Sequence, residues 1–155
     1  MTKFKNHFVI NLLIILLFNS CMIDNEAIDY GSGPIVVQFK DKTATGSFIQ
    51  TADSAKYTYD IPIVALGGNG KALNRDIDFT IAADTLSTAR EGFEFAFSLG
   101  KAFVIKAGNT SANAKIEVLL KNLDASNPKI LILQIVSSSE MVSDNNKTEI
   151  TLQAI

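Results

Sequence analysis

Residues 102–120 read AFVIKAGNTSANAKIEVLL, in which a short apolar run, a turn and an alternating run follow one another. Ala102–Lys106 is predicted to form a strand, because it is mostly apolar and ends at a Gly-Asn pair typical of tight turns. From Ala114 to Leu120 every second residue is apolar, and the charged Lys115 and Glu117 lie between the first of them. A period of two is that of a half-buried strand, so the stretch predicts a strand, a turn and a second strand.

Five further segments show the same features on either side of this stretch. They are Ile35–Phe39, Tyr57–Val64, Ile77–Ile81, Lys129–Val136 and Thr148–Leu152. Lys129–Val136 is nearly continuously apolar, which predicts a central strand buried on both faces. About seven strands between Gly- and Asn-rich turns, without a convincing helix, predict an all-β fold. Hydrophobic spacing alone fits an immunoglobulin-like sandwich or a small barrel.

Pro62 lies inside one of the predicted strands. A proline has no N–H to donate to a β-ladder, so this strand is predicted to lie at a sheet edge or to carry a bulge. A proline at an edge also hinders pairing between molecules, and we therefore expect a monomer. The polar segment Ser137–Lys147 is predicted to be a loop.

The N-terminus has the features of a signal peptide. Lys3 and Lys5 precede the 11-residue run Phe8–Phe18, which is shorter than the roughly 20 residues that span a bilayer. Ser20 and the only cysteine, Cys21, follow. This arrangement resembles the lipobox of bacterial lipoproteins, which implies removal of residues 1–20 and attachment of a diacylglycerol to Cys21. An ordinary secretory peptide with an incidental cysteine is the alternative.

The expected domain organisation follows from this cleavage. Residues 1–20 are the lipoprotein signal peptide, residues 21–34 a tether and residues 35–155 the β-sandwich domain. Asp24 and Glu26 lie just past the cysteine and resemble a surface-export signal of Bacteroidetes-type lipoproteins. The protein is therefore expected in the cell envelope, anchored by lipid in the outer membrane. It could face the periplasm or the outside, and the two acidic residues favour the outside.

The composition excludes several classes of function. The only histidine, His7, lies in the signal peptide, so the mature chain has no imidazole for general base catalysis or zinc binding. Without the two signal-peptide lysines, 12 of the 14 basic side chains remain against 16 acidic ones, a net charge of −4. A chain with no basic run is not expected to bind nucleic acid. We predict no enzymatic activity and no cofactor.

Three segments carry a resemblance to a known family. Thr88–Phe95 has a Thr-Ala start and a Gly-x-acid-aromatic end, Phe103–Ser111 is a strand that ends in Gly-polar-Thr-Ser, and Ile116–Leu120 is followed by Asp124. With them, the chain from about Tyr57 to Leu152 resembles Calx-beta domains and the Calx-beta-like sandwiches of unknown function in Bacteroidetes surface lipoproteins. The resemblance implies an immunoglobulin-like sandwich used in adhesion, display or envelope assembly.

Some Calx-beta domains bind calcium through acidic loops. Here Glu94 and Asp124 stand at matching positions, but the acid-rich cluster after Asp124 is missing, since the chain continues as Ala125–Lys129. Calcium takes six to eight oxygen ligands, several of them carboxylates. No metal site is predicted, and Glu94 and Asp124 are the weak candidates.

Two residue pairs could carry chemistry in the mature domain. Asp76 and Asp78 could act as an acid–base pair, although strand alternation favours a solvated face. Tyr57 and Tyr59 could form a sugar-binding patch or could be packed at the core or at an edge. These features favour a non-catalytic, lipid-anchored envelope module, an accessory or interaction protein beside an outer-membrane protein or glycan. The alternative is a glycan- or calcium-binding adhesin domain.

Overall fold

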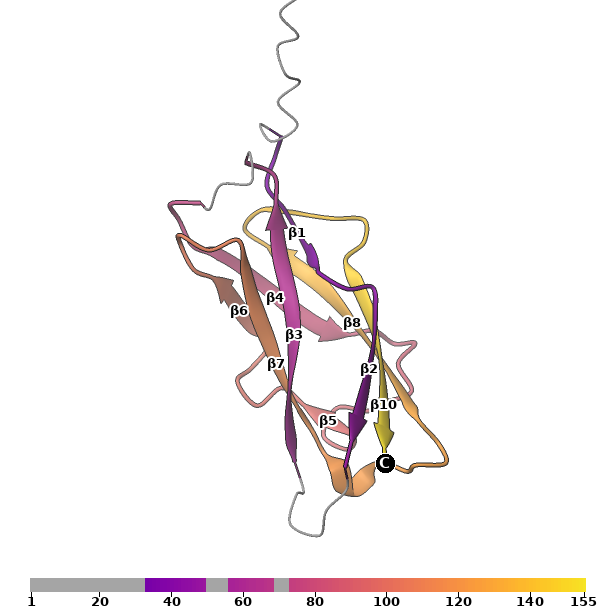
Figure 1. Cartoon of the computed structure of the whole chain (residues 1–155). Coiled ribbons are helices and arrows are strands. Elements are labelled where there is room, and N and C mark those ends of the chain that lie inside the picture. The colour runs from indigo at the N-terminus through magenta and orange to yellow at the C-terminus, as the bar shows by residue number, and fades with distance from the viewer. Residues whose placement is uncertain (1–32, 50–55, 69–72) are drawn as a thin grey trace, which may run out of the picture. The chain divides into compact units, whose positions relative to one another are not determined.

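The computed structural model describes residues 33–49, 56–68 and 73–155, which form two five-stranded β-sheets (Figure 1). One sheet has the strand order β5-β7-β3-β1-β9, and the other has the order β2-β10-β8-β4-β6. The strands are β1 (Val36–Phe39), β2 (Thr43–Phe48), β3 (Tyr57–Leu66), β4 (Ile77–Ala83), β5 (Phe95–Ala96), β6 (Ala102–Ile105), β7 (Ser111–Val118), β8 (Lys129–Ser138), β9 (Met141–Val142) and β10 (Lys147–Ala154). A 3-10 helix, η3 (Leu120–Asn122), follows β7. None of the helices in the described ranges is long and apolar enough to cross a membrane.

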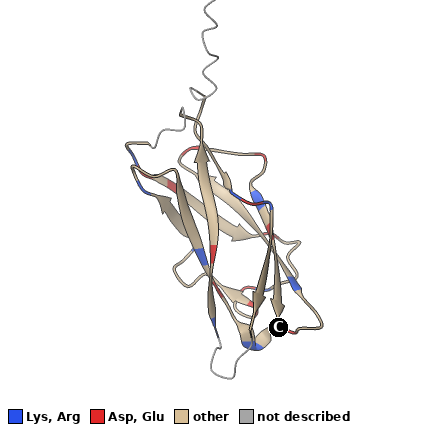
Figure 2. Ribbon diagram, viewed as in Figure 1, with Lys and Arg blue, Asp and Glu red and all other residues tan. Residues whose placement is uncertain are grey.

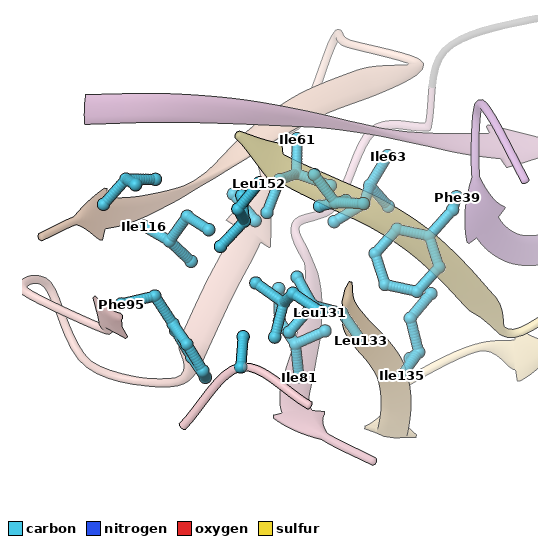
Figure 3. Packing of buried hydrophobic residues seen from close by; sticks show 14 of the residues in the cluster. Phe39, Ile61, Ile63, Ile81, Phe95, Ile116, Leu131, Leu133, Ile135 and Leu152 are labelled. Atoms are coloured by element: carbon cyan, nitrogen blue, oxygen red, sulfur yellow. The ribbon is translucent and has the colours of Figure 1, made fainter. Parts of the chain in front are cut away.

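Alternating side chains from both sheets form the apolar core (Figure 3). Ile61 and Ile63 of β3 lie in it together with Leu131 and Leu133 of β8, and each is at most 3% exposed. The core also buries the predicted inward faces of β4 and of the stretch from β7 to η3. These faces comprise Ile77, Phe79, Ile81, Ala114, Ile116, Val118 and Leu120. The all-β sandwich is confirmed, because two separate sheets enclose the core.

All seven predicted strands are present, and three further strands were missed. β2 lies at the edge of its sheet and pairs in parallel with β10, whereas β5 and β9 have only two residues each. The predicted loop Ser137–Lys147 contains the end of β8, all of β9 and the first residue of β10. β5 and β9 are fixed by strand pairing in the folded protein, and two residues are too few to show a period in the sequence.

The prediction that Pro62 lies in an edge strand or at a bulge is wrong. β3 lies inside its sheet, between β7 and β1, and its pairing with β7 keeps one register through Pro62. The register shift lies instead in β4, between Thr80 and Ile81. The sheet tolerates the proline because β1 ends at Phe39, opposite Ile63, so no strand residue of β1 needs an N–H from Pro62. The reason for expecting a monomer therefore falls away.

β8 is central, as predicted, but it is buried on one face only. Leu131, Leu133 and Ile135 are at most 1% exposed, whereas Val136 is 54% exposed. A two-layer sandwich covers one face of each sheet, so the outward residues Ile130 and Ile132 are only half-buried. The prediction that both faces of β8 are buried, made from its nearly continuous apolar sequence, is therefore wrong.

The chain after β4 runs beside β8 and supplies the hydrogen bonds of a strand partner. Ser87 Oγ and Thr88 Oγ1 accept from the N–H groups of Ile132 and Ile130 at 2.9 and 2.8 Å. Asp84 begins this segment, and its carboxylate accepts from Lys147 Nζ at 2.6 Å and from the Leu86 N–H at 2.9 Å. The hydrogen bond from Lys147, with that from Leu86, holds the pKa of Asp84 below its usual 3.8.

We expect the free energy of unfolding of Asp84→Asn to fall less steeply than that of wild type as the pH is lowered. A carboxyl whose pKa is lower in the folded protein stabilises it above the unfolded pKa, and this contribution is lost as the pH falls through the folded pKa. Urea unfolding between about pH 6 and pH 2 measures the effect. Asp144→Asn is the control, because Asp144 is exposed and its side chain has no hydrogen-bond partner among the described residues. Equal slopes of the free energy of unfolding against pH for wild type and Asp84→Asn would contradict the expectation.

A candidate ligand-binding groove

A tight turn of five residues, Arg90–Glu94, comes directly before β5. The N–H groups of Phe93 and Glu94 donate to the Arg90 carbonyl at 3.1 and 3.0 Å, and Gly92 adopts a φ of +81° that few other residues tolerate. The Glu94 side chain is 2% exposed and accepts from the Arg90 N–H at 2.8 Å. The turn thus folds around a buried carboxylate and places Phe93 at the surface, 45% exposed.

The segment that follows β7 holds this turn from the other side. The Leu119 N–H donates to the Glu94 carbonyl at 2.8 Å, and Asn122 Nδ2 donates to the Phe93 carbonyl. Two positions after Phe93, Phe95 is fully buried and pairs with Val118 of β7. The surface turn is therefore attached directly to the core.

An open groove of about 490 Å³ lies between these segments. We call it the Phe93 groove. Its lining residues are Lys56, Gly92, Phe93, Ala96, Glu117, Leu119, Lys121 and Asn122. Its volume falls within the roughly 300–1,000 Å³ of pockets that bind small molecules.

The charges in the Phe93 groove come from two lysines and one glutamate. Lys56 Nζ lies 3.1 Å from Glu117 Oε2, whereas Lys121 is exposed and has no ion-pair partner in the described ranges. Figure 2 shows basic and acidic residues scattered over both sheets of the domain. The groove combines an aromatic ring, an unpaired cation and a paired carboxylate, an arrangement suited to binding.

The structure gives the two calcium candidates separate local roles. Glu94 closes the turn before β5, as described above, and Asp124 accepts from the N–H and hydroxyl of Ser126 at 2.9 and 2.6 Å. The hydrogen bond from the Ser126 hydroxyl, followed by that from its N–H, lowers the pKa of Asp124 from its usual 3.8. Among the described residues no group of three or more His, Cys, Asp or Glu side chains is arranged to hold a metal ion. Cys21 lies outside the described residues.

The other candidate pairs also take structural positions. Asp76 accepts from Lys106 Nζ and from the Ala107 N–H, both at 2.8 Å, and so fixes the turn after β6. Asp78 is exposed on β4. Tyr57 and Tyr59 both pack on Phe48, with ring centroids 5.1 and 6.0 Å away. Tyr59 lines a cavity of only about 40 Å³, and burial raises its pKa from 10.0.

The Phe93 groove was not predicted from the sequence. Its walls come from the residue just before β3, the turn before β5 with β5 itself, the end of β7 and residues 119–122. These segments lie far apart along the chain. The available signal was Phe93 itself, a large aromatic directly after the glycine of a turn.

Comparisons with known proteins establish the fold. No family model and no curated protein matches the chain. The apo form of the Calx CBD1 domain matches with a TM-score of 0.54 and 12% identity, over 79% of this chain and 99% of that one. The resemblance to Calx-beta domains is thus confirmed at the level of fold.

Proteins from Bacteroides ovatus share the same fold. One, described as a "putative carbohydrate binding protein", matches with a TM-score of 0.56 and 16% identity, over 76% of this chain and 36% of that one. A multidomain protein that includes the domain of unknown function DUF1735 matches with a TM-score of 0.60 and 21% identity, over 77% and 45%. The chain thus spans about a third to a half of these two proteins.

Proposed function

We propose that this Calx-beta-like sandwich is a non-catalytic module of the cell envelope, anchored in the outer membrane by lipid on Cys21, that binds a partner through the Phe93 groove. The observation that carries the proposal is the groove itself, an open site with an exposed aromatic ring and an unpaired lysine. Aromatic rings and a few placed polar groups are what binding sites use for affinity and orientation.

The residues of the groove support binding rather than catalysis. Residues 22–155 contain no histidine and no cysteine, so general base catalysis by imidazole and attack by a thiolate are both excluded. Glycoside hydrolysis typically takes two carboxyl groups on either side of the bond that breaks. The lining of the groove includes one carboxylate, Glu117, which pairs with Lys56. Of the solved structures of the same fold reported above, one is named as a carbohydrate-binding protein and another includes a domain of unknown function.

The N-terminal sequence supports the anchor. A basic start, an 11-residue apolar run and Ser20-Cys21 are the order of parts that a lipoprotein signal peptide requires. A groove on a domain held at the membrane would keep its partner close to the surface, which suits an accessory protein beside an outer-membrane protein. A glycan-binding adhesin is the second candidate, favoured by the exposed ring of Phe93.

A crosslinked pull-down from the protein's own cells tests the proposal. Tagged full-length protein should recover a partner from the outer membrane, either a protein or a glycan, and Cys21→Ala should lose it, because the variant leaves the membrane. Phe93→Ala should also reduce the recovery while the protein stays in the membrane fraction. Unchanged recovery with both variants, or rapid hydrolysis of envelope glycans by the purified protein, would contradict the proposal.

A further inference from the structure

The Phe93 groove carries positive charge on a protein whose mature chain is acidic. The one carboxylate among its lining residues, Glu117, lies 3.1 Å from Lys56, so these two charges balance. Lys121 has no ion-pair partner in the described part of the chain. The unbalanced charge at the groove is therefore the ammonium group of Lys121, which attracts an anionic group.

The ring of Phe93 is held in place before any ligand arrives. The guanidinium carbon of Arg90 lies 4.3 Å from the centre of the ring, in cation–π contact, and Arg90 is not part of the groove lining. Arg90 is itself positioned by the buried Glu94, with Nε 3.6 Å from Oε2. Asn122 fixes the Phe93 carbonyl. A preorganised ring loses little conformational freedom on binding, which favours affinity.

We propose that the Phe93 groove binds an acidic sugar unit of a polysaccharide, with the apolar C–H face of the sugar on Phe93 and its carboxylate beside Lys121. This inference deepens the proposed function, on which it rests, by naming the class of ligand. The C–H face carries partial positive charge and complements the negative face of an aromatic ring. Glu117, Lys56 and Asn122 supply acceptors and donors for sugar hydroxyl groups.

The shape of the site favours a sugar over an extended peptide. Peptides that add to a sheet edge need a row of free backbone groups, and the edge strand at the groove, β5, has only two residues. The groove is also compact, with about 490 Å³ of volume. An acidic sugar chain offers both a flat apolar face and a carboxylate on a single unit.

Isothermal titration of full-length protein in detergent tests the inference. Oligogalacturonate and oligoalginate should bind more tightly than a neutral gluco-oligosaccharide, and added salt should weaken the difference. Phe93→Ala should weaken binding at least about tenfold, because the apolar contact is lost. Lys121→Gln should weaken acidic ligands about two- to fivefold and leave the neutral ligand unchanged.

Matched variants and competing ligands keep the test specific. Leu86→Ala and Lys42→Gln remove an exposed apolar and an exposed basic side chain outside the groove, and both should bind as wild type does. Phe93→Tyr should retain binding. Equal affinity for acidic and neutral chains, no binding of either, or tighter binding of poly-glutamate peptide would overturn the inference. None of these results would change the membrane pull-down, which tests the proposed function separately.

Discussion

Replacing Phe95 by alanine should lower the free energy of unfolding by about 3–5 kcal/mol. Its side chain is fully buried, and its ring meets that of Phe97 edge to face, with centroids 5.7 Å apart. The substitution removes buried apolar area and leaves a cavity that the two sheets cannot close. Domains of this size are stable by about 5–15 kcal/mol in total, so the loss is a large fraction.

Urea unfolding followed by circular dichroism measures this loss. The matched control is Phe93→Ala, the same change two positions earlier, at a side chain that is 45% exposed. It should cost only about 1 kcal/mol, since nearly half of that side chain already faces water. Similar losses for the two variants would contradict the burial of Phe95 as the cause of the effect.

Replacing Cys21 by alanine should move the protein from the membrane fraction to the soluble fraction. Each buried methylene of an acyl chain contributes about 0.8 kcal/mol, and one chain alone binds only marginally, whereas two or more hold a protein stably. Removal of the acceptor cysteine takes all of these chains away at once. The effect is therefore close to all or none, unlike that of any single substitution in the domain.

Fractionation with an alkaline carbonate wash measures this shift. Thr2→Ala is the control, because it changes the signal peptide without touching the cysteine, and it should leave the protein in the membranes. A Cys21→Ala protein that stays in washed membranes would mean that something other than lipid on this residue holds it there.

Alternation of apolar residues in four segments and apolar runs in three others were sufficient to predict seven of the strands. β2 escaped because Thr43–Phe48 is mostly polar and small. Its inward positions include Gly46, at which an added Cβ would lie 2.6 Å from the end of the Phe48 ring. The glycine leaves space for an aromatic side chain that the pattern did not count. Strand existence can thus depend on packing between residues of the same strand.

Pro62 shows where a rule about one residue fails. The rule that proline avoids central strands concerns a missing hydrogen bond, and the bond is missing only if a partner needs it. Because β1 stops at Phe39, opposite Ile63, a central strand can carry the proline. The residue at which β1 ends depends on how the strands pair, so it cannot be predicted from the residues around Pro62.

The candidate site was less predictable than the fold. Sequence reasoning singled out carboxylates and tyrosines, because these residue types carry chemistry in known sites. The structure instead places Phe93 and Lys121 in one groove. Phe93 lies in the turn before β5 and Lys121 in η3, and Asn122 of η3 donates to the Phe93 carbonyl. A groove built from four segments depends on tertiary contacts, so no local pattern could predict it.

The mass of the N-terminal peptide, taken from protein purified out of the membrane, tests the central claim most directly. The claim is that this binding module is held in the envelope by lipid on Cys21. The account predicts a peptide that begins at Cys21 and carries a diacylglycerol. A peptide that begins at another residue, or an unmodified Cys21, would contradict the account.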